Sequence, residues 1–428
     1  MIAVATKEFI DAKVRATVAR SRRLTSLTLK RIGTPHALVP YAASPAHLKA
    51  ANRRLRAIDR RIEQRVAFMA RHAQQAHPRS ILVSIALAER EIDRARRTFG
   101  MLFEIFNQRN GSFAKALAAH DAIASDCYEA VLEAAPMVFD RSILRPFTYM
   151  EHGYSPATMR RGVALSRLLG ETNPFPVIRI PYDRDNPWQS VFLHEVAHNL
   201  QSDLGLWQEN QQALTTRLIR HRSDPLVATV YRRWHKEIFA DLAALLLGGT
   251  ASAWGMMDFL AHPGPKTLTY KPGGAHPTGY IRVLILAEMM RRMGFANDAA
   301  KAREVWRDLY GKAESGRIPK PLLTSAHAII PAVVDEIAFQ PRRNLAQRAL
   351  VDVIPFTRHD EAMIRRGAMV LRAGKIPDLP PRFLVSASRF ALTMGVSAKT
   401  LSDAVIGHLS HSSARERLQP VLRVAHAA

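Results

Sequence analysis

Residues 189–203 read QSVFLHEVAHNLQSD, which places two histidines four positions apart around a glutamate in an otherwise apolar pattern. On a helix, His194 and His198 project from the same face one turn apart, so both imidazole rings can reach one metal ion at about 2.0 Å. Glu195 points beside them, too far round the helix to be a third ligand but well placed for a water molecule on the metal. The stretch therefore predicts a metal site with two histidine ligands and an adjacent carboxylate.

The segments before this stretch predict a strand and then a helix start. Residues 175–182, FPVIRIPY, alternate and are rich in β-branched residues, which is typical of a short strand, and the flanking prolines indicate a sheet edge. Asn186 and Pro187 indicate a helix start, because asparagine can cap free amides and proline suits the first helical position. We expect this helix to run to about Asp203.

A catalytic zinc ion needs a third protein ligand. The metzincin arrangement is excluded, because Gln201 and Leu204 stand where it requires a glycine and a histidine. Further along, Glu237 and Asp241 lie four residues apart on a largely apolar helix face, where unpaired carboxylates are costly to bury. We therefore predict that Glu237 is the third ligand. Asp241 would accept the outer N–H of a ligand histidine and fix its tautomer.

This second helix, which Asp224-Pro225 opens and Gly248-Gly249 ends, leaves two alternatives open. His235 is a rival ligand, but it lies about 160° round the helix from Glu237, so the two cannot face the same ion. In the other alternative, Glu237 is a surface acid that balances a neighbouring cation, namely Arg232, Arg233 or Lys236.

A third element follows, in which His276 and Pro277 mark the mouth of another helix. Tyr280 and Arg282 come next on that helix. A donor from His276, Tyr280 or Arg282 could stabilise the oxyanion that forms when water attacks a carbonyl. Alternatively, Arg282 pairs with a buried carboxylate such as Asp241, and His276 caps the helix.

The three elements, in this order, resemble those of the gluzincin zinc metallopeptidases. The motifs are most similar to the branch that is like the CAAX prenyl proteases, where the second helix often reads Glu-x-x-Ala-Asp, as residues 237–241 do. His-Pro-x-x-x-x-Arg follows in such proteins, as in residues 276–282. The resemblance covers about residues 176–290. Many members of that branch are embedded in membranes, whereas we expect no transmembrane segment here, because the most apolar stretch, residues 242–257, is shorter than the roughly 20 residues of a span.

The resemblance and the helical periodicity together predict a mainly α fold: a zincin-like metallopeptidase core with a small edge β-sheet, flanked by N- and C-terminal helical regions. The resemblance implies one catalytic Zn²⁺ ion on His194, His198 and Glu237. It also implies a peptide or protein substrate, with Glu195 taking a proton from the attacking water. In gluzincins a strand before the metal helix offers its backbone to an extended peptide, and Val177–Ile180 match it in position.

Breaks and changes of pattern predict four regions. Residues 1–45 form a basic segment with a short helix, and residues 46–135 form helical hairpins with breaks near His77-Pro78 and Asn110-Gly111. Residues 136–300 form the metallopeptidase core, and residues 301–428 form a C-terminal helical region.

The composition indicates a globular protein with an unusual charge. Of the 428 residues, 47% are hydrophobic, and the single cysteine, Cys127, excludes an intramolecular disulfide. We expect a soluble, cytoplasmic protein with no targeting signal. The net charge of +24 would attract polyanions such as nucleic acid or anionic membranes. Its densest part, residues 48–71, forms an amphipathic basic helix that either faces solvent or contacts such a partner.

Two other function classes stay open. One is a catalytically inactive zincin-fold module that binds or senses a ligand. The other is a nucleic-acid-associated protease, which the positive charge suggests.

Overall fold

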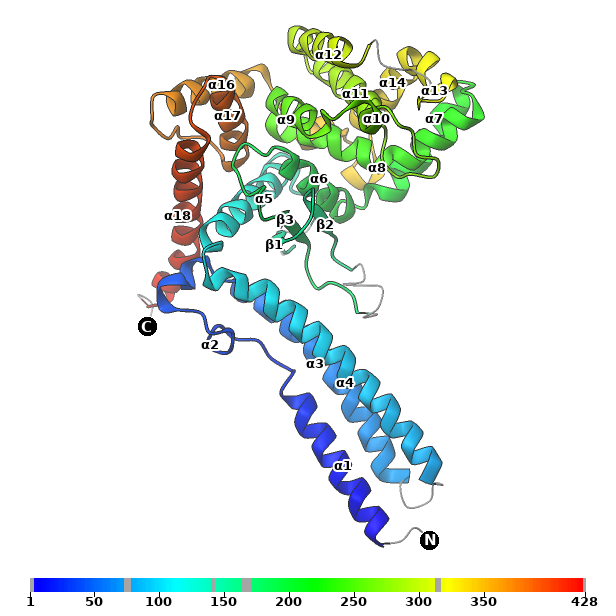
Figure 1. Ribbon diagram of the computed structural model, residues 1–428, viewed down its shortest axis with the longest axis vertical. Helices are drawn as coiled ribbons and strands as arrows, with labels where there is room; N and C mark the ends of the chain where they lie inside the picture. The colour runs from blue at the N-terminus through cyan, green and yellow to red at the C-terminus, as the bar shows by residue number, and fades with distance from the viewer. Residues whose placement is uncertain (1–3, 73–77, 140–142, 163–170, 312–316, 426–428) are drawn as a thin grey trace. The chain divides into compact units, whose positions relative to one another are not determined.

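The computed structural model describes residues 4–72, 78–139, 143–162, 171–311 and 317–425. It is mainly helical with one three-stranded sheet, which confirms the coarse fold expected from the sequence (Figure 1). The chain divides into two compact units. The first comprises Met1–Leu117, Arg161–Pro176 and Ala414–Ala428, and the second comprises Ala118–Arg160 and Val177–Ser413. The four regions expected from the sequence remain a prediction.

The first unit is built on three long helices, α1 (Val4–Arg22), α3 (Pro45–His72) and α4 (Pro78–Asn107). The α3–α4 hairpin confirms the break expected near Pro78 (Figure 1). Short elements complete the unit: α2 (Leu29–Ile32), η1 (His36–Tyr41) and η2 (Gln108–Asn110). The helix expected before residue 45 is longer than predicted, at 19 residues.

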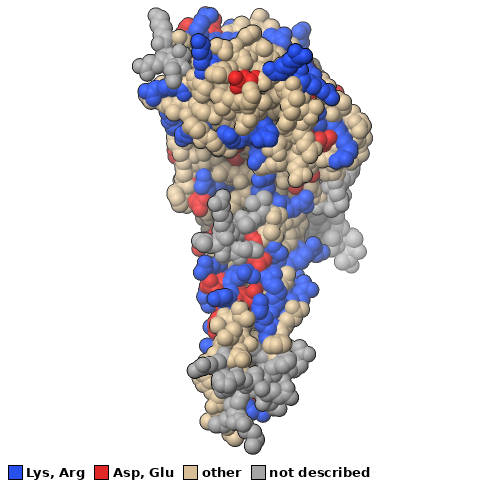
Figure 2. All heavy atoms as spheres, turned by 90° about the vertical axis from the view of Figure 1, so that its right-hand side faces the viewer, with Lys and Arg blue, Asp and Glu red and all other residues tan. Residues whose placement is uncertain are grey.

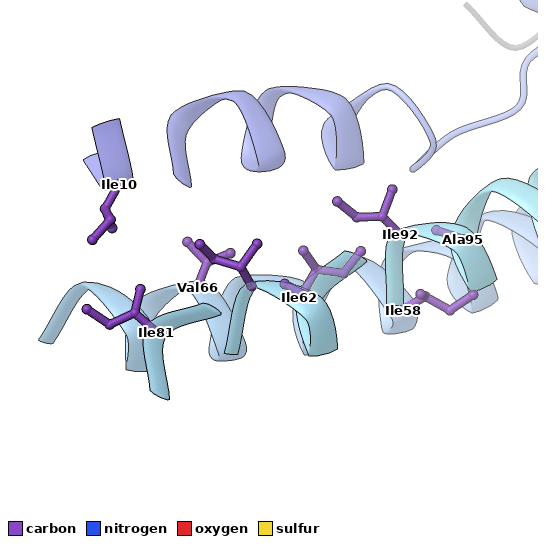
Figure 3. Packing of buried hydrophobic residues seen from close by; sticks show 9 residues of the cluster. Ile10, Ile58, Ile62, Val66, Ile81, Ile92 and Ala95 are labelled. Carbon is purple, nitrogen blue, oxygen red and sulfur yellow. The ribbon is translucent and has the colours of Figure 1, made fainter. Parts of the chain in front are cut away.

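Helix α3 has a charged face and an apolar face. The exposed residues of α3 include Lys49, Arg53, Arg56 and Arg60. Lys and Arg also predominate over Asp and Glu on the face of the molecule shown in Figure 2. The apolar residues of α3, Ile58, Ile62 and Val66, pack with Ile81 and Ile92 of α4 (Figure 3). Ile10 of α1 lies against this row. The spacing of these residues follows the helical period, so one face of each helix supplies the core.

The second unit contains the sheet and the remaining helices, except for the part of the last helix from Ala414 onward. Its strands are β1 (Phe147–Glu151), β2 (Ala157–Met159) and β3 (Val177–Pro181). Helix α5 (Ala114–Ala134) leads into it from the first unit. The helices that surround the candidate site are α6 (Val191–Asp203), α7 (Leu206–Arg220), α8 (Pro225–Gly248), α9 (Thr250–Leu260), α10 (Gly264–Thr267) and α11 (Gly279–Arg292).

Helices continue from Ala296 onward, slightly before residue 301, where the C-terminal helical region was expected to begin. The elements there are α12 (Ala296–Tyr310), α13 (Lys320–Thr324), α14 (Ala326–Val334), a π-helical turn η4 (Asp335–Phe339), η5 (Arg343–Leu345), α15 (Leu350–Val353), α16 (Arg358–Arg372), α17 (Pro381–Thr393) and α18 (Ala398–Ala425). None of the helices among the described residues has both the length and the apolar character that a membrane crossing requires.

The expected edge strand is the central strand of the sheet, so that prediction was wrong. The strand order is β1-β3-β2, with β1 parallel and β2 antiparallel to β3. Pro176 precedes β3 and Pro181 ends it, so the residues between them keep their N–H groups for both neighbours. The edge beside α6 is instead β2, a strand too short to show a sequence pattern.

Helix α8 is the buried centre of the second unit and packs against α6, α7, α9, α11 and α17. Its predicted ends are confirmed. The Asp224 side chain accepts hydrogen bonds from the amides of Leu226 and Val227 at 2.8 and 3.4 Å, and Pro225 opens the first turn. At the other end Gly249 has a φ of 65°, a left-handed conformation that favours glycine. From Ile238 to Gly248 every residue of α8 is buried.

Helices α6 and α11 begin later than predicted. Helix α6 starts at Val191 rather than at Pro187, because the side-chain amide of Asn186 donates to the Asp183 carbonyl at 3.3 Å and does not cap a helix. Helix α11 starts at Gly279, where the Thr278 hydroxyl accepts a hydrogen bond from the Ile281 amide at 3.3 Å. Pro277 therefore precedes the helix and does not open it.

Candidate metal centre

Helices α6 and α8 bring His194, His198 and Glu237 together. One ligand atom from each residue lies within 4.8 Å of the other two, so the group could hold a metal ion. His194 Nε2 is 3.3 Å from Glu237 Oε2, and His198 Nε2 is 3.4 Å from Glu237 Oε1. The Glu237 carboxylate is nearly buried between the two rings, so an ion there would meet two imidazole nitrogens and a carboxylate. That donor set fits zinc.

The charge of Glu237 is held in place by these histidines. Burial favours the neutral acid, but hydrogen bonds from His194 and His198 outweigh it and hold the pKa of Glu237 well below its usual range. Glu237 is therefore a carboxylate in the fold. It is not the surface acid of the alternative interpretation, because its exposed fraction is 8%.

Two buried residues, Asp241 and Arg282, lie on the Nδ1 side of the His194 ring. His194 Nδ1 is 2.8 Å from Asp241 Oδ1, as expected for an aspartate that fixes the ring. Arg282 donates to the same carboxylate through Nε at 2.8 Å and Nη2 at 2.6 Å. Burial alone would raise the pKa of Asp241, but Arg282 and His194 outweigh it and lower that pKa. The alternative in which Arg282 pairs with Asp241 is thus the observed one.

The same surroundings favour a proton on His194 when no metal is bound. Burial opposes the charged ring, yet Asp241 and Glu237 raise the pKa of His194 to about 9. Nε2 of the ring faces Glu237 while Nδ1 faces Asp241. A metal ion at Nε2 would replace a proton there, since a histidine ligand must be neutral.

Glu195 lines a cavity of about 490 Å³ that also contains the three candidate ligands. Its backbone carbonyl accepts a hydrogen bond from the Thr158 hydroxyl of β2 at 2.9 Å. Within the described part of the chain, no hydrogen bond to its side-chain carboxylate is recorded. The cavity wall comes from the β2 segment and from α6, α8, α9 and the loop before α11, with Ser155, Pro156, Ala157, Val191, Met256, Phe259 and Ala275 among the lining residues.

Of the predicted site residues His276 and Tyr280, only His276 lines the cavity. His276 lines the cavity with a side chain that is 70% exposed, and its Nε2 lies 3.5 Å from Glu237 Oε1. His276 is not a helix cap, since Thr278 has that role. Tyr280 is half-buried on α11 but is not among the residues that line the cavity.

The rival ligand His235 lies outside the metal group. Its Nδ1 is 2.7 Å from the Arg232 carbonyl oxygen, and its Nε2 is 3.2 Å from the Trp207 carbonyl oxygen. Its ring meets the Trp207 ring edge-on. The prediction that His235 and Glu237 do not face the same ion is therefore consistent with the fold, in which His235 is not part of the metal group.

Sequence reasoning missed a cationic cluster in the same cavity, formed by Arg160, Trp207 and Lys236. Arg160 Cζ lies 3.9 Å from the centroid of the Trp207 ring, and Lys236 Nζ lies 3.3 Å from it. Burial lowers the pKa of Arg160. Burial and the charge of Arg160 lower the pKa of Lys236, and the Glu237 carboxylate partly opposes this effect. Lys236 adjoins Glu237 in sequence, but no local pattern links either residue to Arg160.

The fold and the site define a mainly helical protein with a small sheet and a buried group of two histidines and a glutamate that could hold a metal ion. No family model, curated protein or solved structure matches the chain. Its function therefore has to be argued from the site.

Proposed function

We propose that this chain is a zinc metallopeptidase of the gluzincin type, with a zincin-like core. The observation that carries the proposal is the convergence of His194, His198 and Glu237 at one wall of a cavity that Glu195 also lines. Two helices supply these groups with the spacing that resembles the gluzincin motifs. The three donors would hold a single Zn²⁺ ion.

The residues around the ion have separate tasks. When bound, zinc supplies Lewis acidity that activates water and polarises a carbonyl oxygen. Glu195 accepts a proton from the attacking water and returns it to the leaving amine. Asp241 holds the His194 ring, and Arg282 neutralises Asp241 inside the fold. His276, on the exposed side of the cavity, is the best placed of the predicted donors to contact the developing oxyanion.

The substrate in this proposal is a peptide or protein in an extended conformation. Strand β2 is an edge strand beside α6, and its residues Ala157 and Thr158 line the cavity. An extended peptide can add to such an edge through main-chain hydrogen bonds. Strand β2 thus takes the role that the resemblance had assigned to Val177–Ile180.

Metal content and cleavage test the proposal together. We expect the purified protein to contain one zinc per chain by elemental analysis and to cleave members of a peptide library. The Glu195→Gln variant keeps the zinc and loses cleavage, because it lacks the base, whereas Glu237→Ala loses the zinc. The control His235→Gln keeps zinc, since His235 lies outside the group.

Two results would contradict the proposal. A wild-type protein without stoichiometric zinc would remove the metal site. A protein that holds zinc but cleaves no peptide would favour the inactive binding or sensing module.

A further inference from the structure

Two cations that line the cavity form no ion pair with a carboxylate among the described residues. Arg160, which follows β2, and Lys236 of α8 both lie over the ring of Trp207 at the start of α7. Both cations are half-buried, and no ion pair of either with a described carboxylate is recorded. The carboxylate next to Lys236 in sequence belongs to Glu237, which faces the two histidines instead.

The Trp207 ring contacts both cations. Its ring holds Lys236 Nζ at 3.3 Å from the centroid, so the ammonium group is directed to the indole. The Trp207 carbonyl oxygen in turn lies 3.2 Å from His235 Nε2, which ties the start of α7 to α8. Trp207 is therefore a positioning residue for the two cations.

A desolvated cation is stabilised more by an anion than by an aromatic face, because a charge-assisted hydrogen bond adds to the attraction. Arginine in particular presents parallel N–H groups that match a carboxylate. The same cavity is also lined by the apolar side chains of Val191, Met256 and Phe259. Its lining therefore combines two cations with apolar surface.

We propose that Arg160 and Lys236 form a carboxylate-binding subsite that selects the substrate. The preferred peptide carries a carboxylate close to the bond that is cut. That carboxylate is either an acidic side chain or the free C-terminus, which share the same chemistry. This inference rests on the proposed peptidase function, since the subsite and Glu195 share one cavity.

Matched peptides that differ only in charge test the subsite in the zinc-loaded full chain. One pair has Glu or Gln near the cleaved bond, and the other has a free or an amidated C-terminus. We expect kcat/KM to be at least about tenfold higher for the charged member of one pair, as for a single charged hydrogen bond. A preference for Glu over Gln would show that the subsite binds an acidic side chain. A lower kcat/KM for the amidated peptide would show that it binds the free C-terminus.

The Arg160→Gln/Lys236→Gln double variant should lower that ratio to about one while its zinc content stays stoichiometric. The Lys266→Gln control should keep the wild-type ratio, because Lys266 stacks on Tyr154 at 4.1 Å and does not line the cavity. Equal cleavage of both members of both pairs by the wild type, or a preference that survives in the double variant, would overturn the proposal.

Binding separates this inference from the proposed function. Calorimetric titration of the Glu195→Gln variant measures peptide affinity without cleavage. We expect this variant to bind the charged peptide more tightly than the neutral one. Adding the Arg160→Gln and Lys236→Gln substitutions should abolish this difference. If the wild type cleaves nothing but this difference is found, the peptidase proposal fails and the subsite stands. If cleavage occurs and charged and neutral peptides bind equally, the subsite fails alone.

Discussion

Three contacts from two side chains converge on Asp241, which lies next to the candidate metal ligand His194. His194 Nδ1 lies 2.8 Å away, and Arg282 approaches through two nitrogens at 2.8 and 2.6 Å. An aspartate can accept all of these contacts, whereas an asparagine offers one carbonyl oxygen and no charge. The Asp241 carboxylate therefore both orients the His194 ring and neutralises Arg282.

We predict that Asp241→Asn weakens zinc binding about 10- to 100-fold, because His194 loses its orientation and basicity. Competition with a chromophoric chelator measures the affinity. The control is Glu288→Gln, which alters a buried carboxylate paired with Arg291 and Arg303 and away from the metal group. An unchanged zinc affinity in Asp241→Asn would show that Asp241 does not support the ligand.

Glu288 also gives a pH-dependent prediction. The hydrogen bond from Arg291 lowers its pKa from the usual 4.5, so its stabilising effect is complete above that value and is lost as the pH falls through the folded pKa. We expect the difference in unfolding free energy between wild type and Glu288→Gln to shrink as the pH falls from about 6 to about 3. Urea unfolding at a series of pH values measures it. A difference that stays constant over this range would contradict the ion pair.

At the scale of single elements, α8 shows how local chemistry places site residues. The Asp224 cap and Pro225 set its start, and Glu237 and Asp241 follow at fixed positions along the same buried face. These features are local, so the sequence was sufficient to predict them. In contrast, the start of α6 was mispredicted because Asn186 bonds back to Asp183 rather than to a helix amide.

We predict that Asp224→Ala lowers the unfolding free energy by about 1 kcal/mol, because two amides at the start of α8 lose their acceptor. Asp224→Asn, which keeps an acceptor oxygen, should change it much less. Zinc content should be normal in both variants, since the cap lies three turns before Glu237. Equal stability of Asp224→Ala and wild type in chemical unfolding would show that the cap does not contribute.

At the scale of the whole molecule, the net charge of +24 is not evenly available to a partner. On α3, Arg54 and Arg61 pair with Glu171, and Arg61 also pairs with Glu91. Another set on the same helix surrounds a surface hollow with a single acidic residue, Asp59, and comprises Lys49, Arg53, Arg56 and Arg60. Among the described side chains of α3, this second set forms no ion pair and is exposed, so it can contact a polyanion.

If the positive charge binds nucleic acid, the protein should bind duplex DNA with an affinity that falls steeply as the salt concentration rises. Replacing Lys49, Arg53, Arg56 and Arg60 by glutamine should then weaken binding and make it less dependent on salt. Fluorescence anisotropy between about 50 and 150 mM salt measures both effects. A wild-type protein that does not bind DNA at about 150 mM would remove the nucleic-acid-associated alternative.

What the sequence by itself determined is local and periodic: the helices, the shared face of His194 and His198, and the spacing of Glu237 and Asp241 on α8. The 3.6-residue period links sequence distance directly to direction, so these inferences needed no knowledge of the fold. Only the tertiary structure decided which strand forms the sheet edge, that Arg282 pairs with Asp241, and that Arg160, Trp207 and Lys236 meet in one cavity. Each of these depends on contacts between distant segments, and no periodic pattern within one segment records which distant surface will pack against it.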